Sequence, residues 1–104
     1  MKIIFLASTK PDLRWFKQYY TKAFPAGREN ANRQYRAFLA LLKESPVIGR
    51  AVEDAENTRE YPIPRTPFTV LYRIASEHIE VMRVYDQRSD FSNRHLKPSG
   101  ETDA

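Results

Sequence analysis

The chain has 104 residues, of which 41% are hydrophobic, and this is long enough for one domain with a single packed core. Its 17 lysines and arginines against 13 acidic residues give a formal net charge of +4, which favours an acidic or anionic partner such as a phosphate backbone or an acidic protein segment. The absence of cysteine excludes disulfides, thiolate zinc sites and cysteine nucleophiles. No apolar run is long enough to span a bilayer, so we expect a cytoplasmic protein without a membrane segment.

The first half of the chain predicts one strand and two helices. Residues 2–7 (KIIFLA) are a short apolar run, which indicates a strand buried on both faces or nearly so. Thr9 precedes Asp12 at the spacing of a capping box, and apolar residues then recur at helical spacing until Phe24 precedes a proline. A second amphipathic helix is predicted from Arg28 to Glu44, so the two segments should form an antiparallel helical hairpin.

The second half predicts a sheet. Residues 45–58 contain proline, glycine and a run of acidic residues, which is typical of a surface connection. Residues 58–86 then read as three strands in an antiparallel meander, the first of which is placed at an edge by its prolines. The predicted fold is therefore α+β, with an N-terminal strand, an α-helical hairpin and a three-stranded antiparallel meander in one domain over residues 1–91. Residues 92–104 are predicted to be a polar, partly disordered tail.

Two helices can cover only one face of such a sheet. We expect the other face to stay partly open and to carry Arg73 and Arg83. Arginine suits bidentate contacts to carboxylate and phosphate, so the residues proposed to bind a target or partner are Arg59, Arg73, Arg83 and Arg88.

Little in the sequence points to chemistry. His78 and His95 occur without cysteine and without metal-ligand spacing, and the three glycines are isolated, so neither a metal nor a cofactor is expected. Candidate residues around a phosphodiester would be Arg73, Arg83, Tyr85 and Arg88. In the alternative interpretation, Arg73 and Arg83 simply pair across strands with Glu60 or Glu80.

Several short motifs then resemble a known family. The segments ESPVIGR, TREYPI, TPFTVLYRI and IEVMRVYDQRSDF, in the order strand, helical hairpin and meander, resemble the RelE/ParE toxins of bacterial type II toxin–antitoxin systems. The resemblance covers about residues 2–91. It implies a small toxin that is neutralised by a cognate antitoxin, ParD-like or similar, whose extended and helical segments wrap around it.

The resemblance also implies a choice of target. RelE-like members cut messenger RNA on the ribosome, whereas ParE-like members lack the cutting residues and inhibit DNA gyrase. Thr69 and Gln87 stand where the cutting branch carries arginines, and the tail has Phe91 but no tyrosine. A ParE-like gyrase inhibitor that is not an enzyme is therefore favoured. The alternatives are a ribosome-dependent mRNA endoribonuclease and a basic RNA- or DNA-binding module; the endoribonuclease would use Arg83, Tyr85 and Arg88.

Overall fold

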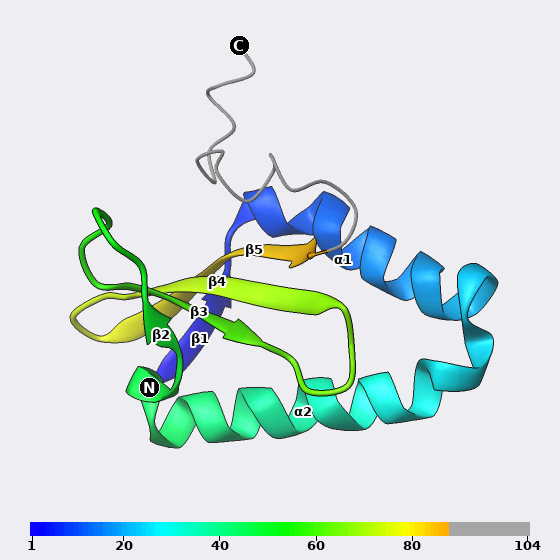
Figure 1. The fold of residues 1–104 in the computed structure, drawn as a ribbon. Helices are drawn as coiled ribbons and strands as arrows, with labels where there is room; N and C mark the ends of the chain where they lie inside the picture. Colours follow the sequence, from blue (N-terminus) through cyan, green and yellow to red (C-terminus); the bar gives the residue numbers. More distant parts are fainter. Residues whose placement is uncertain (88–104) are drawn as a thin grey trace, which may run out of the picture.

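The computed structural model describes residues 1–87, which form a five-stranded mixed sheet with two α-helices (Figure 1). The sheet order is β1-β5-β4-β3-β2; β1 runs parallel to β5, and the other pairs are antiparallel. The predicted α+β class is confirmed, with one strand more than expected. The elements are β1 (Lys2–Phe5), α1 (Lys10–Gln18), α2 (Arg28–Glu44), β2 (Arg50–Ala51), β3 (Thr58–Pro62), β4 (Phe68–Ile74) and β5 (His78–Asp86).

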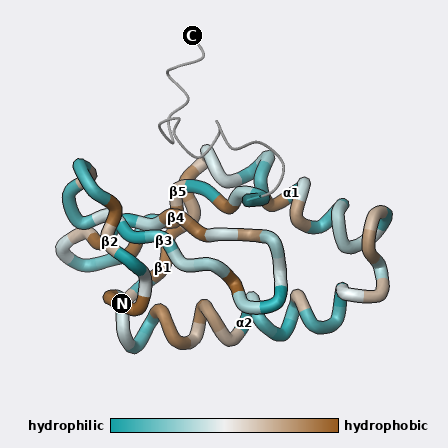
Figure 2. The backbone as a smooth tube through the Cα atoms, in the orientation of Figure 1, coloured by the Kyte–Doolittle hydropathy of each residue, from teal (hydrophilic) through white to brown (hydrophobic). Residues whose placement is uncertain are grey.

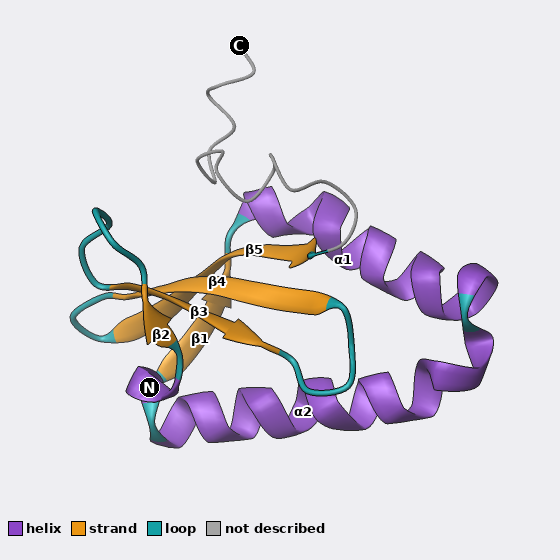
Figure 3. Ribbon diagram, in the orientation of Figure 1, coloured by secondary structure: helices purple, strands orange, loops and turns teal. Residues whose placement is uncertain are grey.

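The helices are joined at one end and separate toward the sheet (Figures 1 and 3). α1 continues as a π-helical turn over Tyr19–Ala23, and Phe24 leaves the helical region with φ −144° before a short 3-10 turn. The predicted bounds of the second helix are confirmed. The predicted capping box is wrong, because the Thr9 hydroxyl donates to the Leu6 carbonyl and the Asp12 carboxylate turns to β5.

The core lies between the helices and one face of the sheet. Phe16 of α1 packs edge-to-face on Phe68 of β4, with ring centroids 4.8 Å apart, and Phe38 of α2 stacks on Tyr61 of β3 at 4.9 Å. Figure 2 shows that the hydrophobic residues of α2 concentrate in the half that lies beside the sheet. Burial of these apolar side chains is what holds both helices to the sheet. The fully or almost fully buried members are Ala31, Phe38, Leu42, Ile63, Phe68, Val70, Tyr72, Ile79, Val81 and Val84.

Two strands differ from the prediction. β1 is not buried on both faces; it lies at the end of the sheet order, and Ile4 and Phe5 are 36% and 37% exposed. β2 lies within the segment predicted to be a surface connection, where Arg50 pairs with Glu60 of β3. This short strand takes the edge position that the prolines had suggested for β3.

A β-bulge changes which side chains of β5 face the core. Leu71 lies opposite Arg83, but the next residue of β4 lies opposite Val81, so Met82 is an extra residue in β5. Strict alternation along the strand predicts Ile79, Val81, Arg83 and Tyr85 on one face, and the bulge makes this prediction wrong. Val81 and Val84 are both buried on the core side of β5. Arg83 lies on the opposite face of the sheet, together with Arg73.

Tyr72 connects the sheet to the turn before β2. Its buried hydroxyl donates to the Pro46 carbonyl at 2.6 Å and accepts from the Gly49 N–H at 2.9 Å. A Cβ on Gly49 would lie 2.7 Å from that hydroxyl, so the close approach requires glycine. Arg59 supports the same turn, since its guanidinium donates to the carbonyls of Gly49 at 2.6 Å and Val47 at 3.3 Å. The ESPVIGR and TREYPI motifs thus meet at one structural junction.

We expect the substitution Tyr72→Phe to lower the free energy of unfolding by about 1–3 kcal/mol, because it leaves the Gly49 N–H and the Pro46 carbonyl without their partner. Urea denaturation followed by circular dichroism measures the change. Tyr61→Phe is the matched control, since Tyr61 is half-buried and contacts the core through its ring. Equal stability of the two variants would contradict the role of the hydroxyl.

Candidate partner-binding surfaces

The sheet face opposite α2 is one candidate surface, and we call it the open face. Neither α-helix of residues 1–87 lies over it; α1 reaches it only where Asp12 meets the edge of β5. The register of β3, β4 and β5 places alternate side chains there, and most of them are charged or polar. Its members include Glu60, Leu71, Arg73, Glu80, Arg83 and Tyr85.

Arg73 and Glu80 form a cross-strand pair on this face. They are directly opposite in the ladder, and the Arg73 guanidinium donates from Nε (2.9 Å) and from Nη2 to the same carboxylate oxygen. His78 contacts the other oxygen at 2.9 Å. The hydrogen bonds from His78 and Arg73 lower the pKa of Glu80. The lowered pKa means that this contribution to stability is present above the ordinary carboxyl pKa and is lost as the pH falls through the lowered one.

Arg83 pairs with a residue that the sequence analysis had assigned to a helix cap. Its Nε and Nη2 donate to the two carboxylate oxygens of Asp12 at 2.6 and 3.0 Å, and the Val84 N–H donates to the first of these oxygens at 2.9 Å. The side chains of Arg83 and Asp12 are only 23% and 12% exposed. The hydrogen bond to Asp12 raises the pKa of Arg83. This junction fixes the start of α1 against β5.

Glu60 connects three strands at the other end of the open face. One carboxylate oxygen accepts from Arg50 of β2 at 2.8 Å, and the other accepts from the Tyr85 hydroxyl of β5 at 2.8 Å. Arg50 remains largely exposed, whereas the Glu60 side chain is mostly covered. The hydrogen bond and the charge of Glu60 raise the pKa of Arg50.

These contacts decide where the predicted site residues lie. The Arg73–Glu80 pair is the cross-strand pair of the alternative interpretation, whereas Arg83 binds Asp12 rather than Glu60 or Glu80. Arg83 and Tyr85 share a face but hydrogen-bond to different carboxylates, so the described residues bring no group of basic side chains together around a phosphodiester.

Two of the predicted residues fall elsewhere. Arg59 points its guanidinium at the carbonyls of Val47 and Gly49, which gives it a structural role in the turn before β2. Arg88 lies outside the described residues, as does the predicted tail. Within residues 1–87, no group of three or more histidine, cysteine, aspartate or glutamate side chains could hold a metal ion, and no helix is long and apolar enough to cross a membrane.

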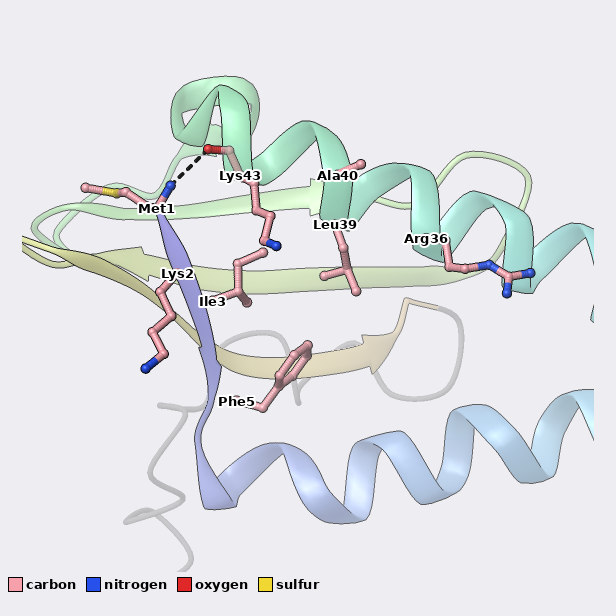
Figure 4. Close-up of a pocket in the computed structure, with 8 residues that line it drawn as sticks. All are labelled: Met1, Lys2, Ile3, Phe5, Arg36, Leu39, Ala40 and Lys43. Carbon is pink, nitrogen blue, oxygen red and sulfur yellow. Dashed lines mark hydrogen bonds between the residues drawn. The ribbon is translucent and has the colours of Figure 1, made fainter.

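A groove between β1 and α2 is the second candidate surface, and sequence reasoning missed it. Figure 4 shows Ile3 and Phe5 of β1 facing α2, with Leu39 of α2 facing β1. The groove has a volume of about 880 Å³, and the cations at its border are Lys2, Arg36 and Lys43. The amino terminus closes one end, where it donates to the Lys43 carbonyl at 3.2 Å.

The groove also borders an open strand edge. Within the described residues β1 pairs only with β5, so its outer edge presents backbone donors and acceptors to any segment that enters the groove. The alternation of apolar side chains at Ile3 and Phe5 was the available signal in the sequence. This alternation could not be recognised in the sequence, because Ile4 and Leu6 are apolar as well and make the apolar run continuous.

The comparisons with known proteins agree on one fold. A family model described as the ParE toxin of type II toxin-antitoxin system, parDE, matches residues 3–91. A solved structure described as the chromosomal ParDE TA system from P. aeruginosa superposes with a TM-score of 0.63 at 17% identity, covering 83% of this chain and 95% of that chain. At this identity the likeness shows the fold alone. No curated protein matches the sequence.

The substitution Asp12→Asn should destabilise the protein by about 2 kcal/mol, because it removes the charge that pairs with the half-buried Arg83 guanidinium. The midpoint of urea denaturation measures the loss. Glu29→Gln, in the first turn of α2, is an exposed control that removes the same charge from the other helix. If both variants unfold at the same urea concentration, the Asp12 junction does not contribute as proposed.

Proposed function

We propose that this chain, which belongs to the ParE toxin family of type II toxin–antitoxin systems, inhibits DNA gyrase by binding to it and performs no chemistry of its own. A member of this family is one half of a toxin–antitoxin pair, so a cognate antitoxin is its partner. The open face is the observation that carries the proposal. Its side chains are mostly charged or polar, and neither α-helix lies over it.

The arginine contacts on the open face support binding rather than catalysis. The Arg73 side chain is 48% exposed, and its bonds to Glu80 use Nε and Nη2, which leaves Nη1 to donate to a carboxylate of a partner. Arg83 and Tyr85 each hold a different carboxylate of the same chain. A nuclease would need these groups gathered on one phosphodiester. The observed arrangement suits a protein surface with interspersed charges.

We propose that the antitoxin occupies the groove between β1 and α2. An extended polypeptide could pair with the backbone groups of the open β1 edge, and addition of a strand to a sheet edge is a common mode of peptide recognition. Apolar side chains of such a segment would meet Phe5 and Leu39, and acidic ones would meet Lys43 and the other cations at the border.

Purified protein should block negative supercoiling of a relaxed plasmid by gyrase, and this supercoiling assay tests the proposed target. The double substitution Arg73→Glu with Glu80→Arg keeps an ion pair on the open face but exchanges the positions of its positive and negative charges. We expect it to weaken inhibition by about tenfold or more, because like charges placed together at an interface cost several kcal/mol.

The matched control for this assay is Arg33→Glu, an exposed residue of α2 that belongs to neither surface. It should inhibit like the unchanged protein. Gyrase that is unaffected by excess toxin would rule out this target. New codon-positioned transcript ends after brief expression would instead support the endoribonuclease alternative.

The groove assignment makes a separate prediction about the antitoxin. Phe5→Glu places a charge among the apolar groove residues, and we expect it to weaken antitoxin binding by about tenfold or more, measured by calorimetry with the product of the adjacent reading frame. Leu41→Glu is the control, since Leu41 is an exposed apolar residue of α2 outside the groove. Equal binding by both variants would place the antitoxin elsewhere on the toxin.

A further inference from the structure

Exposed aromatic and cationic side chains gather on the outer side of α1 and the π-helical turn that continues it. Trp15 is 42% exposed and Phe24 is 48% exposed, which is unusual for residues of this size. Polar residues recur every four positions at Arg14, Gln18 and Lys22 and form a polar row, and aromatic residues recur in the same way at Trp15 and Tyr19. Tyr19 and Lys22 belong to the π-helical turn. We call this surface the aromatic–cationic ridge; its members are Arg14, Trp15, Gln18, Tyr19, Lys22 and Phe24.

The rings of the ridge lie next to one another. The centroids of Trp15 and Tyr19 are 6.1 Å apart, and those of Tyr19 and Phe24 are 6.4 Å apart. Gly27 leaves room for the Phe24 ring, since a Cβ there would lie 2.4 Å from it. The π-helical turn lies between the aromatic residues, and such turns occur frequently at functional sites. The exposed rings therefore form one contiguous aromatic group at this end of the hairpin.

The ridge also has uncompensated positive charge. Residues 10–23 contain four cations and only one acidic residue, Asp12. The Asp12 carboxylate is already bound by Arg83 and by the Val84 N–H, so it does not neutralise its helical neighbours. Arg14 and Lys22 are exposed on the polar row, one on each side of Gln18.

Exposed rings beside cations are what single-stranded nucleic acids bind. Unpaired bases stack on aromatic side chains whatever their sequence, and neighbouring cations contact the phosphates. A duplex hides the faces of its bases, so it could use only the cations. An acidic polypeptide would need a groove for its apolar side chains, and no ridge residue lines the groove between β1 and α2.

We infer that the aromatic–cationic ridge binds single-stranded nucleic acid, with a base stacked on Trp15 and the sugar–phosphate backbone along Arg14 and Lys22. This inference does not rest on the gyrase proposal, because the ridge belongs to α1 and not to the sheet. A toxin that fails to inhibit gyrase would still be expected to bind the strand.

Trp15 is the only tryptophan of the chain, so its fluorescence reports directly on the ridge. Titration of the full chain with a twelve-residue oligothymidine (dT12) should quench this emission. The apparent Kd should rise with salt concentration. A plot of log Kd against the logarithm of the salt concentration should have a slope of about 0.7 for each phosphate that the protein neutralises. In an anisotropy assay with labelled oligonucleotide, Trp15→Leu should weaken binding by about tenfold, because stacking on one ring is lost.

Two double variants separate the ridge from general charge. Arg14→Gln with Lys22→Gln should lower the salt slope by about 1.4, whereas Arg33→Gln with Arg65→Gln, which removes the same charge at exposed positions outside the ridge and the groove, should leave Trp15 quenching intact. Circular dichroism melting checks that each variant is folded. Equal losses in both double variants, or unchanged binding by Trp15→Leu, would overturn the inference. So would quenching by poly-glutamate at the same affinity, which would identify an acidic polypeptide as the ligand.

Discussion

The edge of β5 is the constraint on which the rest of the structure depends. β1 covers that edge only as far as Val81, and beyond this point the backbone of β5 would lack partners. Leu6 donates its N–H to the Val81 carbonyl, the Ser8 hydroxyl donates to the Met82 carbonyl, and the Asp12 carboxylate accepts from the Val84 N–H. The chain therefore follows the strand edge as it turns into α1. This path keeps the helix beside the sheet and leaves the open face uncovered by α1 and α2.

The same path separates the surfaces of the toxin. α2 lies under one side of the sheet and forms a groove with the edge strand β1, while the charged residues of β3, β4 and β5 occupy the opposite side. An antitoxin in the groove and a target on the open face would contact different residues. Neutralisation would then require the antitoxin to extend beyond the groove or to hold the toxin away from its target by its bulk.

The sequence predicted what local patterns determine. The α+β class, the bounds of α2 and the end of the first helix at Phe24 follow from helical spacing and from proline, which act within a few residues. It could not predict the partners of Asp12 and Arg83, which are 71 residues apart and meet only in the folded chain. Thr9 and Asp12 have capping-box spacing, but the Asp12 carboxylate accepts three hydrogen bonds from Arg83 and Val84 of β5 instead.

The parallel pairing of β1 with β5 has a consequence for synthesis of the toxin. Lys2 of β1 lies opposite His78 of β5. β1 is synthesised first, but it can therefore pair with a neighbouring strand only after β5 has been synthesised. Among the strands of residues 1–87, β5 is also the only one that links β1 to the rest of the sheet. A nascent or truncated chain that stops before β5 would lack the junction between its two halves, so toxicity should emerge only when translation of the domain is nearly complete.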